Sequence, residues 1–429
     1  MNRFQIILIA AFAFFAVFGV FLFATFRGAG ENQQISVTMW GTLPQVDFYS
    51  WYSSTPLSKN NNITVTYVYK NPDTFDQDFV EALADGRGPD IIFLPHEKIL
   101  EHGNRIYPIP YDTLSERNFR DLFVEGTEIF LGPNGSYALP IIIDPLVMYW
   151  NRDIFRNAGI AQVPQYWDEF PSLALSLVER DSLKNITQSA VALGEYGNVY
   201  RARDIISVLL MQAGTPITQQ SSLGLQSVLG STFNFATMPA DAALTFYTQF
   251  ANPAKDIYSW NRSFNNSLNI FASGDLGILF ARSSDLFAIQ SRNPNLNFDV
   301  ALLPQPREAT NKMTYGYMEG LALVKQSQKL SGAYRVIQEL TSKESVTALS
   351  NILKLPPVRR DVLVSRPSDA YLSVFYESAL ISQAWLSPHP ATTDSIFRDM
   401  VESITSGRLR MGEAIRAASD ALNRALGRN

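Results

Sequence analysis

An apolar segment opens the chain, and no charged side chain occurs from Phe4 to Phe26. A helix of these 23 residues, at about 1.5 Å per residue, is long enough to cross the roughly 30 Å hydrocarbon core of a bilayer. The residues that follow, Phe26-Arg27-Gly28-Ala29-Gly30, contain no good Ala-x-Ala cleavage site. We therefore expect residues 1–30 to form an uncleaved membrane anchor, and a cleaved secretory signal is the alternative.

Beyond this segment, strand-like and helix-like patterns alternate. Strands are predicted at 35–40, 63–68, 90–95, 137–143, 146–150, 276–281, 298–303 and 320–324. Helical spacing is found at 75–84, 167–180, 202–213, 331–341, 343–351, 371–380, 395–404 and 411–426. The Gln/Ser-rich segment 215–230 predicts a surface loop. The alternation of strands and helices predicts an α/β fold with parallel strands.

Composition narrows the class of protein. The chain is 46% hydrophobic and 17% charged, which provides enough apolar material for large cores. Roughly 400 residues follow the apolar segment, and two lobes are the simplest division of that length. A net charge of −5 without any basic run argues against nucleic-acid binding. The absence of cysteine excludes disulfides and thiolate metal sites.

Signatures of catalysis and metal binding are missing from the sequence. There is no His-Glu-x-x-His, no phosphate-binding Gly-x-x-x-x-Gly-Lys and no Gly-x-Ser-x-Gly. The histidines are His96, His102 and His389, and the first two are six residues apart, a spacing that does not place them on one helical face. We expect a protein without enzymatic activity, metal or cofactor.

Several short motifs occur in an order that identifies a family. They are 88–94 (GPDIIFL), 138–140 (ALP), 149–155 (YWNRDIF), 158–160 (AGI), 164–170 (PQYWDEF), 271–277 (FASGDLG), 303–304 (LP), 316–320 (GYMEG), 340–344 (LTSKE) and 413–414 (EA). Together these motifs resemble family 1 extracellular solute-binding proteins, the ligand receptors of ABC importers. The resemblance extends from residue 35 to about residue 426.

The resemblance implies a two-lobed periplasmic-binding-protein-like fold of type II, with a cleft between the lobes. We expect residues 31–143 and 303–342 in the first lobe, and residues 144–302 and 343–429 in the second. Strand crossings are expected near Ile143-Asp144, near Leu302-Leu303 and from Thr341 to Val346.

The residues favour the sugar-binding members of this family. A sugar presents apolar C–H faces to aromatic rings and a rim of hydroxyls to carboxylates, amides and arginines. By their places in the family pattern, we expect ligand contacts from the polar residues Glu97, Lys98, Asp144, Glu195, Arg282 and Glu319. The expected aromatic contacts are Trp40, Trp260, Tyr317 and Phe397. Arg282 departs from the aromatic residue that many relatives carry in its region.

The resemblance also implies a function and a location. We expect a monomer that captures a saccharide and delivers it to the permease subunits of an ABC transporter. Its body would lie on the extracellular or periplasmic side of the cell membrane, held by the single-pass helix. The alternatives are a non-sugar ligand such as a peptide, polyamine or metal chelate, a sensor role, and, less favoured, a carbohydrate-active enzyme.

Overall fold

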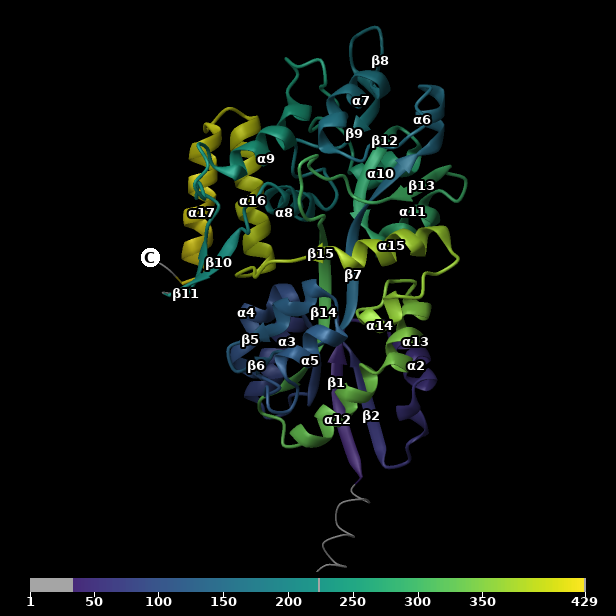
Figure 1. The fold of residues 1–429 in the computed structure, drawn as a ribbon, viewed down its shortest axis with the longest axis vertical. Coiled ribbons are helices and arrows are strands. Elements are labelled where there is room, and N and C mark those ends of the chain that lie inside the picture. Colours follow the sequence, from purple (N-terminus) through teal and green to yellow (C-terminus); the bar gives the residue numbers. More distant parts are fainter. Residues whose placement is uncertain (1–33, 223, 428–429) are drawn as a thin grey trace, which may run out of the picture.

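The computed structural model describes residues 34–222 and 224–427, drawn in colour in Figure 1. Among these residues, no helix has both the length and the apolar character needed to cross a membrane. The expected anchor, residues 1–30, lies outside the described part of the chain.

One large sheet runs through the molecule, with strand order β2-β1-β3-β14-β7-β12-β9-β8 and with β4, β13 and β15 joined at its sides. Its strands are β1 (Ile35–Gly41), β2 (Ile63–Tyr69), β3 (Ile91–Pro95), β4 (Ile106–Tyr107), β7 (Leu139–Asn151), β8 (Glu179–Arg180), β9 (Ile186–Val191), β12 (Leu276–Arg282), β13 (Phe298–Ala301), β14 (Thr314–Val324) and β15 (Ser382–Gln383). β1 is parallel to both β2 and β3, as the strand and helix alternation predicts.

The long strand β7 connects the two halves of this sheet. Its first half pairs with β14 as far as Pro145, and from Leu146 onward it pairs with β12. The sequence suggested two runs separated by Asp144-Pro145, whereas the structure has one continuous strand. Because proline has no N–H to donate, its position at the change of pairing partner avoids a lost hydrogen bond in the middle of a ladder.

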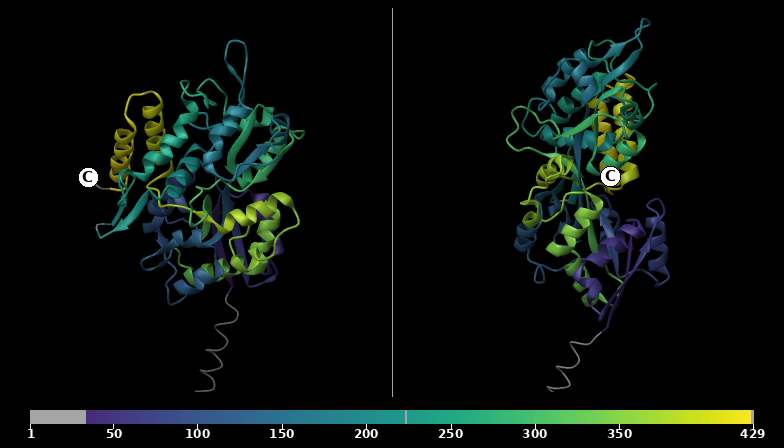
Figure 2. Two further views of the ribbon diagram at one scale, coloured as in Figure 1. Left: turned by 45° about the horizontal axis from the view of Figure 1, so that its top comes forward. Right: turned by 90° about the vertical axis from the view of Figure 1, so that its right-hand side faces the viewer.

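Helices surround both halves of the sheet. They are α2 (Gln45–Ser54), α3 (Phe75–Ala84), α4 (Ile99–His102), α5 (Glu116–Leu122), α6 (Arg152–Asn157), α7 (Phe170–Leu177), α8 (Ala202–Gln212), α9 (Pro239–Thr248), α10 (Ser267–Ser273), α11 (Leu286–Arg292), α12 (Leu330–Leu340), α13 (Lys343–Leu353), α14 (Arg360–Leu363), α15 (Ala370–Leu380), α16 (Pro390–Thr405) and α17 (Met411–Ala425). α16 and α17 pack together on the outside of one half, as Figure 2 shows. Within the expected surface loop 215–230, the chain forms a hairpin of β10 (Thr218–Ser221) and β11 (Gly224–Ser227), and a short hairpin of β5 (Leu131–Gly132) and β6 (Gly135–Ser136) lies in the other half.

Two hydrophobic cores correspond to the two lobes of Figure 1. The core of the first lobe is built on β1, β3 and α12, and the core of the second on β12, α8 and α17. Along β7, Ile143 belongs to the first core and Leu146 to the second. Along β14, Tyr315 belongs to the second core and Met318 to the first. Both strands therefore cross between the lobes.

The buried side chains refine the expected lobe boundaries. Leu303 still packs in the second core, since the chain crosses later, within β14. Val346 and Leu363, on α13 and α14, pack in the first core, although residues 343–429 were expected in the second lobe. The chain returns only at α15, where Phe375 contacts the second core and Ala379 the first. The lobe boundaries themselves remain a prediction.

Candidate functional site

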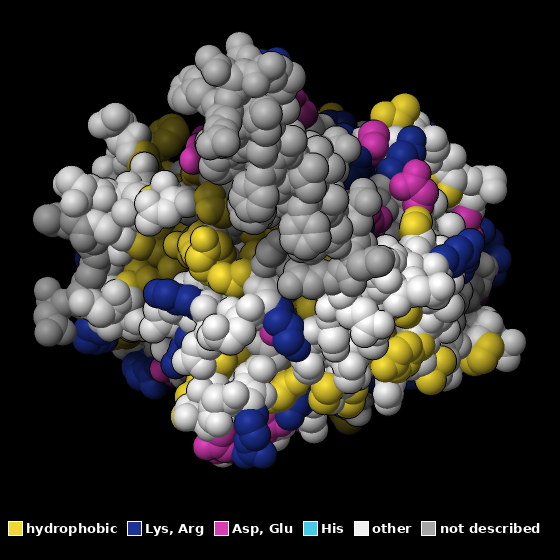
Figure 3. All heavy atoms as spheres, turned by 90° about the horizontal axis from the view of Figure 1, so that it is seen from below, with side chains coloured by type: hydrophobic (Ala, Val, Ile, Leu, Met, Phe, Trp, Pro, Cys, Tyr) yellow, Lys and Arg dark blue, Asp and Glu magenta, His cyan; other side chains and the backbone are white. Residues whose placement is uncertain are grey.

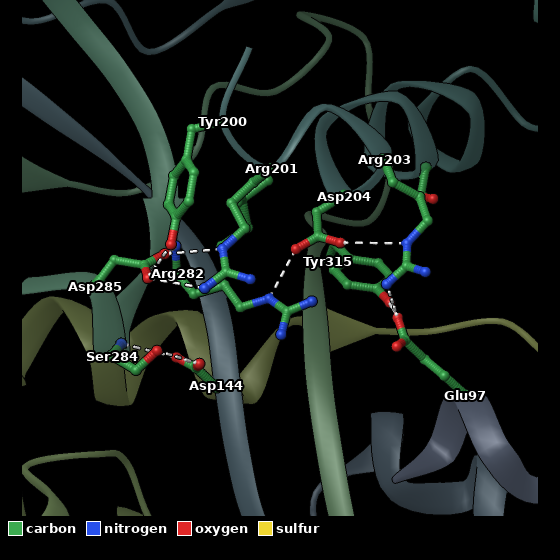
Figure 4. Close-up of polar contacts among 12 residues, drawn as sticks. Glu97, Asp144, Tyr200, Arg201, Arg203, Asp204, Arg282, Ser284, Asp285 and Tyr315 are labelled. Carbon is green, nitrogen blue, oxygen red and sulfur yellow. Dashed lines mark hydrogen bonds and ion pairs between the residues drawn. The ribbon is translucent and has the colours of Figure 1, made fainter. Parts of the chain in front are cut away.

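A polar network lies where the lobes meet, and an ion pair from Glu97 to Arg203 joins them (Figure 4). Glu97 follows β3 in the first lobe, and Arg203 is in the first turn of α8 in the second. Arg203 Nη2 lies 2.5 Å from Glu97 Oε1, and Nη1 donates to the Pro390 carbonyl at 3.1 Å. Burial opposes the charged form of Glu97, but Arg203 and other positive neighbours outweigh it and lower its pKa to about 2.

A chain of hydrogen bonds extends this junction to the crossing strand β14. Tyr315 Oη donates to Glu97 Oε1 at 3.0 Å and lies 3.3 Å from His96 Nε2. The Met318 N–H donates to His96 Nδ1 at 3.2 Å. Complete burial lowers the pKa of His96 to about 4. The ring is therefore neutral at pH 7.

Arg282, at the end of β12, occupies the centre of the network. Its Nε donates to Asp204 of α8 at 2.7 Å, and its guanidinium carbon lies 4.4 Å from the centre of the Tyr317 ring. Tyr317 Oη in turn donates to Glu319 at 2.5 Å. Burial raises the pKa of Glu319, although the Tyr317 bond and the positive charge of Arg282 partly offset this.

Asp144, on β7, is held by the segment that follows β12. Its Oδ1 accepts bonds from the Ser283 hydroxyl at 2.7 Å and the Ser284 N–H at 2.9 Å, and its Oδ2 accepts from the Ser284 hydroxyl at 2.6 Å. Burial raises the pKa of Asp144 in spite of these bonds and of the nearby Arg282.

A second arginine and aspartate pair borders the network. Arg201 donates to both oxygens of Asp285, at 3.0 and 2.8 Å, and Tyr200 Oη also donates to Asp285 at 2.8 Å. Asp285 is 5% exposed, and its Oδ2 also accepts the Arg282 N–H. These bonds fix the start of α8 relative to β12.

Two cavities lie at opposite ends of α8. The one at the N-terminal end has a volume of about 450 Å³ and is lined by Arg201, Arg203, Asp204 and Arg282, among others. The one at the C-terminal end has a volume of about 960 Å³, and its lining comes from both lobes, including Ile129 and Trp385. The smaller cavity contains one of the ten expected ligand residues, Arg282, and the larger one contains none of them.

Two expected residues of the first lobe lie outside the network. The Trp40 ring is 8% exposed and is covered by Lys70, whose Nζ lies 3.9 Å from the ring centre. Lys98 Nζ forms ion pairs with Asp76 and, at 2.8 Å, with Glu101. Among the described residues, one group has ligand atoms close enough together to hold a metal ion: Asp76, Glu101 and His102. The Lys98 ammonium, however, already lies beside both carboxylates and supplies a positive charge there.

Three expected residues of the second lobe are also bound elsewhere. Glu195 pairs with Arg262 at 2.9 Å. Trp260 and Phe397 are 0% exposed and lie in the second core, the first stacked on Phe264 and the second on Trp385. In this conformation their rings present no face to a ligand. A ligand-binding role for the ten expected residues remains a prediction.

The network also contains residues that the sequence reasoning missed. They are His96, Tyr200, Arg201, Arg203, Asp204, Ser283, Ser284, Asp285 and Tyr315. One sequence signal was available: Tyr200-Arg-Ala-Arg-Asp204 places three charged residues at the start of an otherwise apolar helix. The partners of these charges are far away in the sequence, so the pattern alone does not indicate what they bind.

Comparison with solved structures shows that other proteins share this fold. A cyclo/maltodextrin-binding protein solved in complex with maltotetraose has a TM-score of 0.74 at 16% identity, over 92% of this chain and 98% of that one. A cyclic alpha-maltosyl-1,6-maltose binding protein from Arthrobacter globiformis has a TM-score of 0.76 at 15% identity, over 91% and 99%. These likenesses establish the two-lobed α/β fold.

Sequence comparison gives a consistent result. A binding protein of Brucella abortus (strain 2308) is 23% identical over 295 residues, which are 67% of this chain. The chain spans 66% of the length of that curated relative. The family model described as bacterial extracellular solute-binding protein matches residues 57–347. The members of this family are binding proteins and not enzymes, in agreement with the prediction from the sequence. The chain belongs to the bacterial extracellular solute-binding proteins.

Proposed function

We propose that this protein captures a saccharide outside the cell and delivers it to the permease of an ABC transporter. The observation that carries the proposal is the junction of the lobes: charged and aromatic side chains from both lobes and both crossing strands meet around Arg282 and Tyr317. Carboxylates and arginines can bond sugar hydroxyls, and aromatic rings can cover sugar C–H faces. A maltotetraose-bound structure and a cyclic alpha-maltosyl-1,6-maltose binding protein, both of similar fold, support the same ligand class.

Binding is proposed to couple to movement of the lobes about β7, β14 and α15. The ion pair from Glu97 to Arg203 holds the lobes together in this structure. Hinge closure around a ligand is a common transition of two-lobed binding proteins. A ligand that bridges the lobes would stabilise the joined arrangement, and its departure would allow Glu97 and Arg203 to separate.

Titration calorimetry tests the ligand class. The panel consists of neutral oligosaccharides, acidic saccharides, amino acids, short peptides and polyamines. Each compound is titrated into two forms of the protein: a soluble form of residues 31–429, and the full chain in detergent. We expect saccharides to bind and the other classes to give no heat. Binding of a peptide or polyamine in place of every saccharide would overturn the proposal.

We also propose that residues 1–30 remain attached as a membrane anchor, with the body outside the cell. The apolar length and the poor cleavage site support this. Intact-mass spectrometry of the membrane-extracted protein should give the mass of the full chain, and protease added to whole cells should remove the body. A mature N-terminus after Ala24 or Ala29 would contradict the anchor, and full protection from protease would contradict the orientation.

A further inference from the structure

We propose that the ligand is an acidic saccharide whose carboxylate binds at the N-terminal end of α8, against Arg282. This inference rests on the proposed function and makes its ligand class more specific. It is carried by three observations: an arginine with unused donors, the charges that line the cavity, and the uncapped start of α8.

Arg282 is 7% exposed, yet only its Nε is bound to a protein acceptor. Among the described residues, no hydrogen bond or ion pair ends on its two terminal nitrogens, and Figure 4 shows them without a dashed line. The terminal nitrogens are not sealed from solvent, so within the cavity that Arg282 lines they can donate either to water or to a ligand. A carboxylate matches the two donors in a bidentate geometry.

Asp204 and Tyr317 hold this guanidinium in place. Asp204 accepts from Nε at 2.7 Å, and the plane of the group lies over the Tyr317 ring at 4.4 Å. The terminal nitrogens are therefore oriented before any ligand arrives. Preorganised donors bind more tightly because less side-chain entropy is lost on binding.

Arginines outnumber acids among the side chains that line this cavity, and each of the arginines is also paired with a carboxylate. Four arginines line it, Arg201, Arg203, Arg282 and Arg398, against two aspartates, Asp204 and Asp394. Glu97 and Asp285 bind Arg203 and Arg201 but do not line the cavity. On the molecular face in Figure 3, by contrast, Lys and Arg side chains are intermixed with Asp and Glu side chains.

The start of α8 adds backbone donors to the same wall. α8 has 11 residues, and its N-cap residue, Arg201, has φ 57° and provides no side-chain cap. Among the described residues, the N–H groups of Arg203 and Asp204 have no backbone acceptor. Unpaired N–H groups and the positive end of a helix dipole both favour an anion. The buried side chain of Arg282 lines the same cavity as Arg203 and Asp204.

Calorimetry with matched ligands tests the inference. The probes are digalacturonate, maltose and glucose 6-phosphate, so that carboxylate, neutral and phosphate groups are compared. We expect digalacturonate to bind at least 10-fold more tightly than maltose. A preference for the phosphate ester would overturn the assignment of a carboxylate, and equal or tighter binding of maltose would overturn the inference while leaving the proposed function intact. If none of the saccharides binds, the proposed function fails with it.

The variant Arg282→Lys separates charge from geometry. Lysine keeps a positive charge beside Asp204 but loses the two parallel donors. We expect about a 10-fold loss of affinity for digalacturonate and little change for maltose. Arg307→Lys is the matched control, because Arg307 is half exposed and lies on Tyr166, away from this cavity. An equal loss for both sugars, or a loss in the control, would overturn the role of Arg282.

Discussion

Two buried carboxylates at the junction of the lobes are bound in different ways. Glu97, on the right of Figure 4, pairs with an arginine of the opposite lobe, whereas Asp144, on the left, is bound by Ser283 and Ser284. The pKa of Glu97 is lowered and that of Asp144 is raised. A directly paired arginine therefore outweighs burial at Glu97, whereas serine donors and the more distant Arg282 do not outweigh it at Asp144.

The comparison also separates two structural roles. The Glu97 pair can break when the lobes move apart, because the neighbouring Ile99 packs in the first core and Ile205, beside Arg203, in the second. The bonds of Asp144 join β7 to the segment after β12, its neighbour in the sheet, so they persist in any movement that keeps this part of the sheet intact. Changes at Glu97 should alter the distance between the lobes, and changes at Asp144 should alter the stability of the fold.

The largest effect is expected at Trp260, which lies wholly within one lobe. Trp260 is 0% exposed, stacks on Phe264 at 4.6 Å and donates from Nε1 to Asn198 at 3.0 Å. Trp260→Ala should lower the free energy of unfolding by about 4 kcal/mol, the cost of a large core cavity. Urea denaturation measures this, with Trp260→Phe as the control that keeps most of the ring. A stable Trp260→Ala variant with weakened ligand binding would instead restore the aromatic platform that the sequence suggested.

Trp260 shows what the sequence could and could not predict. Apolar runs and helical spacing predicted α3 with its observed bounds, and five of the eight predicted strands match to within two residues, because burial of one face sets the period; strand β9 was not predicted. The sequence does not tell whether an aromatic side chain packs in a core or faces a ligand, since both need a large apolar ring. The full length of β14 was also missed, because Gly316 and Glu319 interrupt its apolar pattern.

The places of Glu97 and Asp144 in the family pattern put both residues near the junction of the lobes. The sequence did not indicate which residues they bind. Arg203 lies 106 residues from Glu97, and Ser284 lies 140 residues from Asp144. Such pairs are decided by which ends of strands and helices meet after folding. In the sequence, the charged residues at the start of α8 are as compatible with a solvated helix surface as with a buried network between the lobes.

The next effect concerns pH and the neutral His96 beside Glu97. A free histidine has a pKa near 6.5, and burial lowers that of His96 to about 4. Between these values the unfolded chain binds a proton that the folded protein does not, so stability is lost as the pH falls from 6.5 to 4. The loss should reach roughly 3 kcal/mol.

Thermal unfolding at a series of pH values measures this loss. His96→Asn keeps an acceptor for the Met318 N–H and should remove most of the slope between pH 6.5 and 4. His389→Asn is the control, because the His389 side chain is 40% exposed. An unchanged slope in His96→Asn would show that other groups cause the acid sensitivity.

Glu97→Gln should shift the lobes toward separation. Losing one partner of a buried ion pair costs about 3 kcal/mol, although Arg203 can recover part of this by reaching water when the lobes part. Small-angle X-ray scattering without ligand should show a larger radius of gyration than in the wild type. The control Glu116→Gln removes an exposed pair with Arg120 and should leave the radius unchanged. An identical radius for Glu97→Gln would mean that this pair does not hold the lobes together.

The smallest of these effects is expected at Asp144, and its size distinguishes a structural acid from a ligand-binding one. Asp144→Ala leaves the Ser283 hydroxyl and both Ser284 donors without their acceptor, so it should cost about 2 kcal/mol of unfolding free energy. Asp144→Asn keeps the acceptor for two of these donors, and because the pKa of Asp144 is already raised, it should cost under about 1 kcal/mol. Urea denaturation compares the two variants. If Asp144→Asn is as stable as the wild type but loses saccharide affinity, the carboxylate charge serves the ligand, as the sequence suggested, and the serines only orient it.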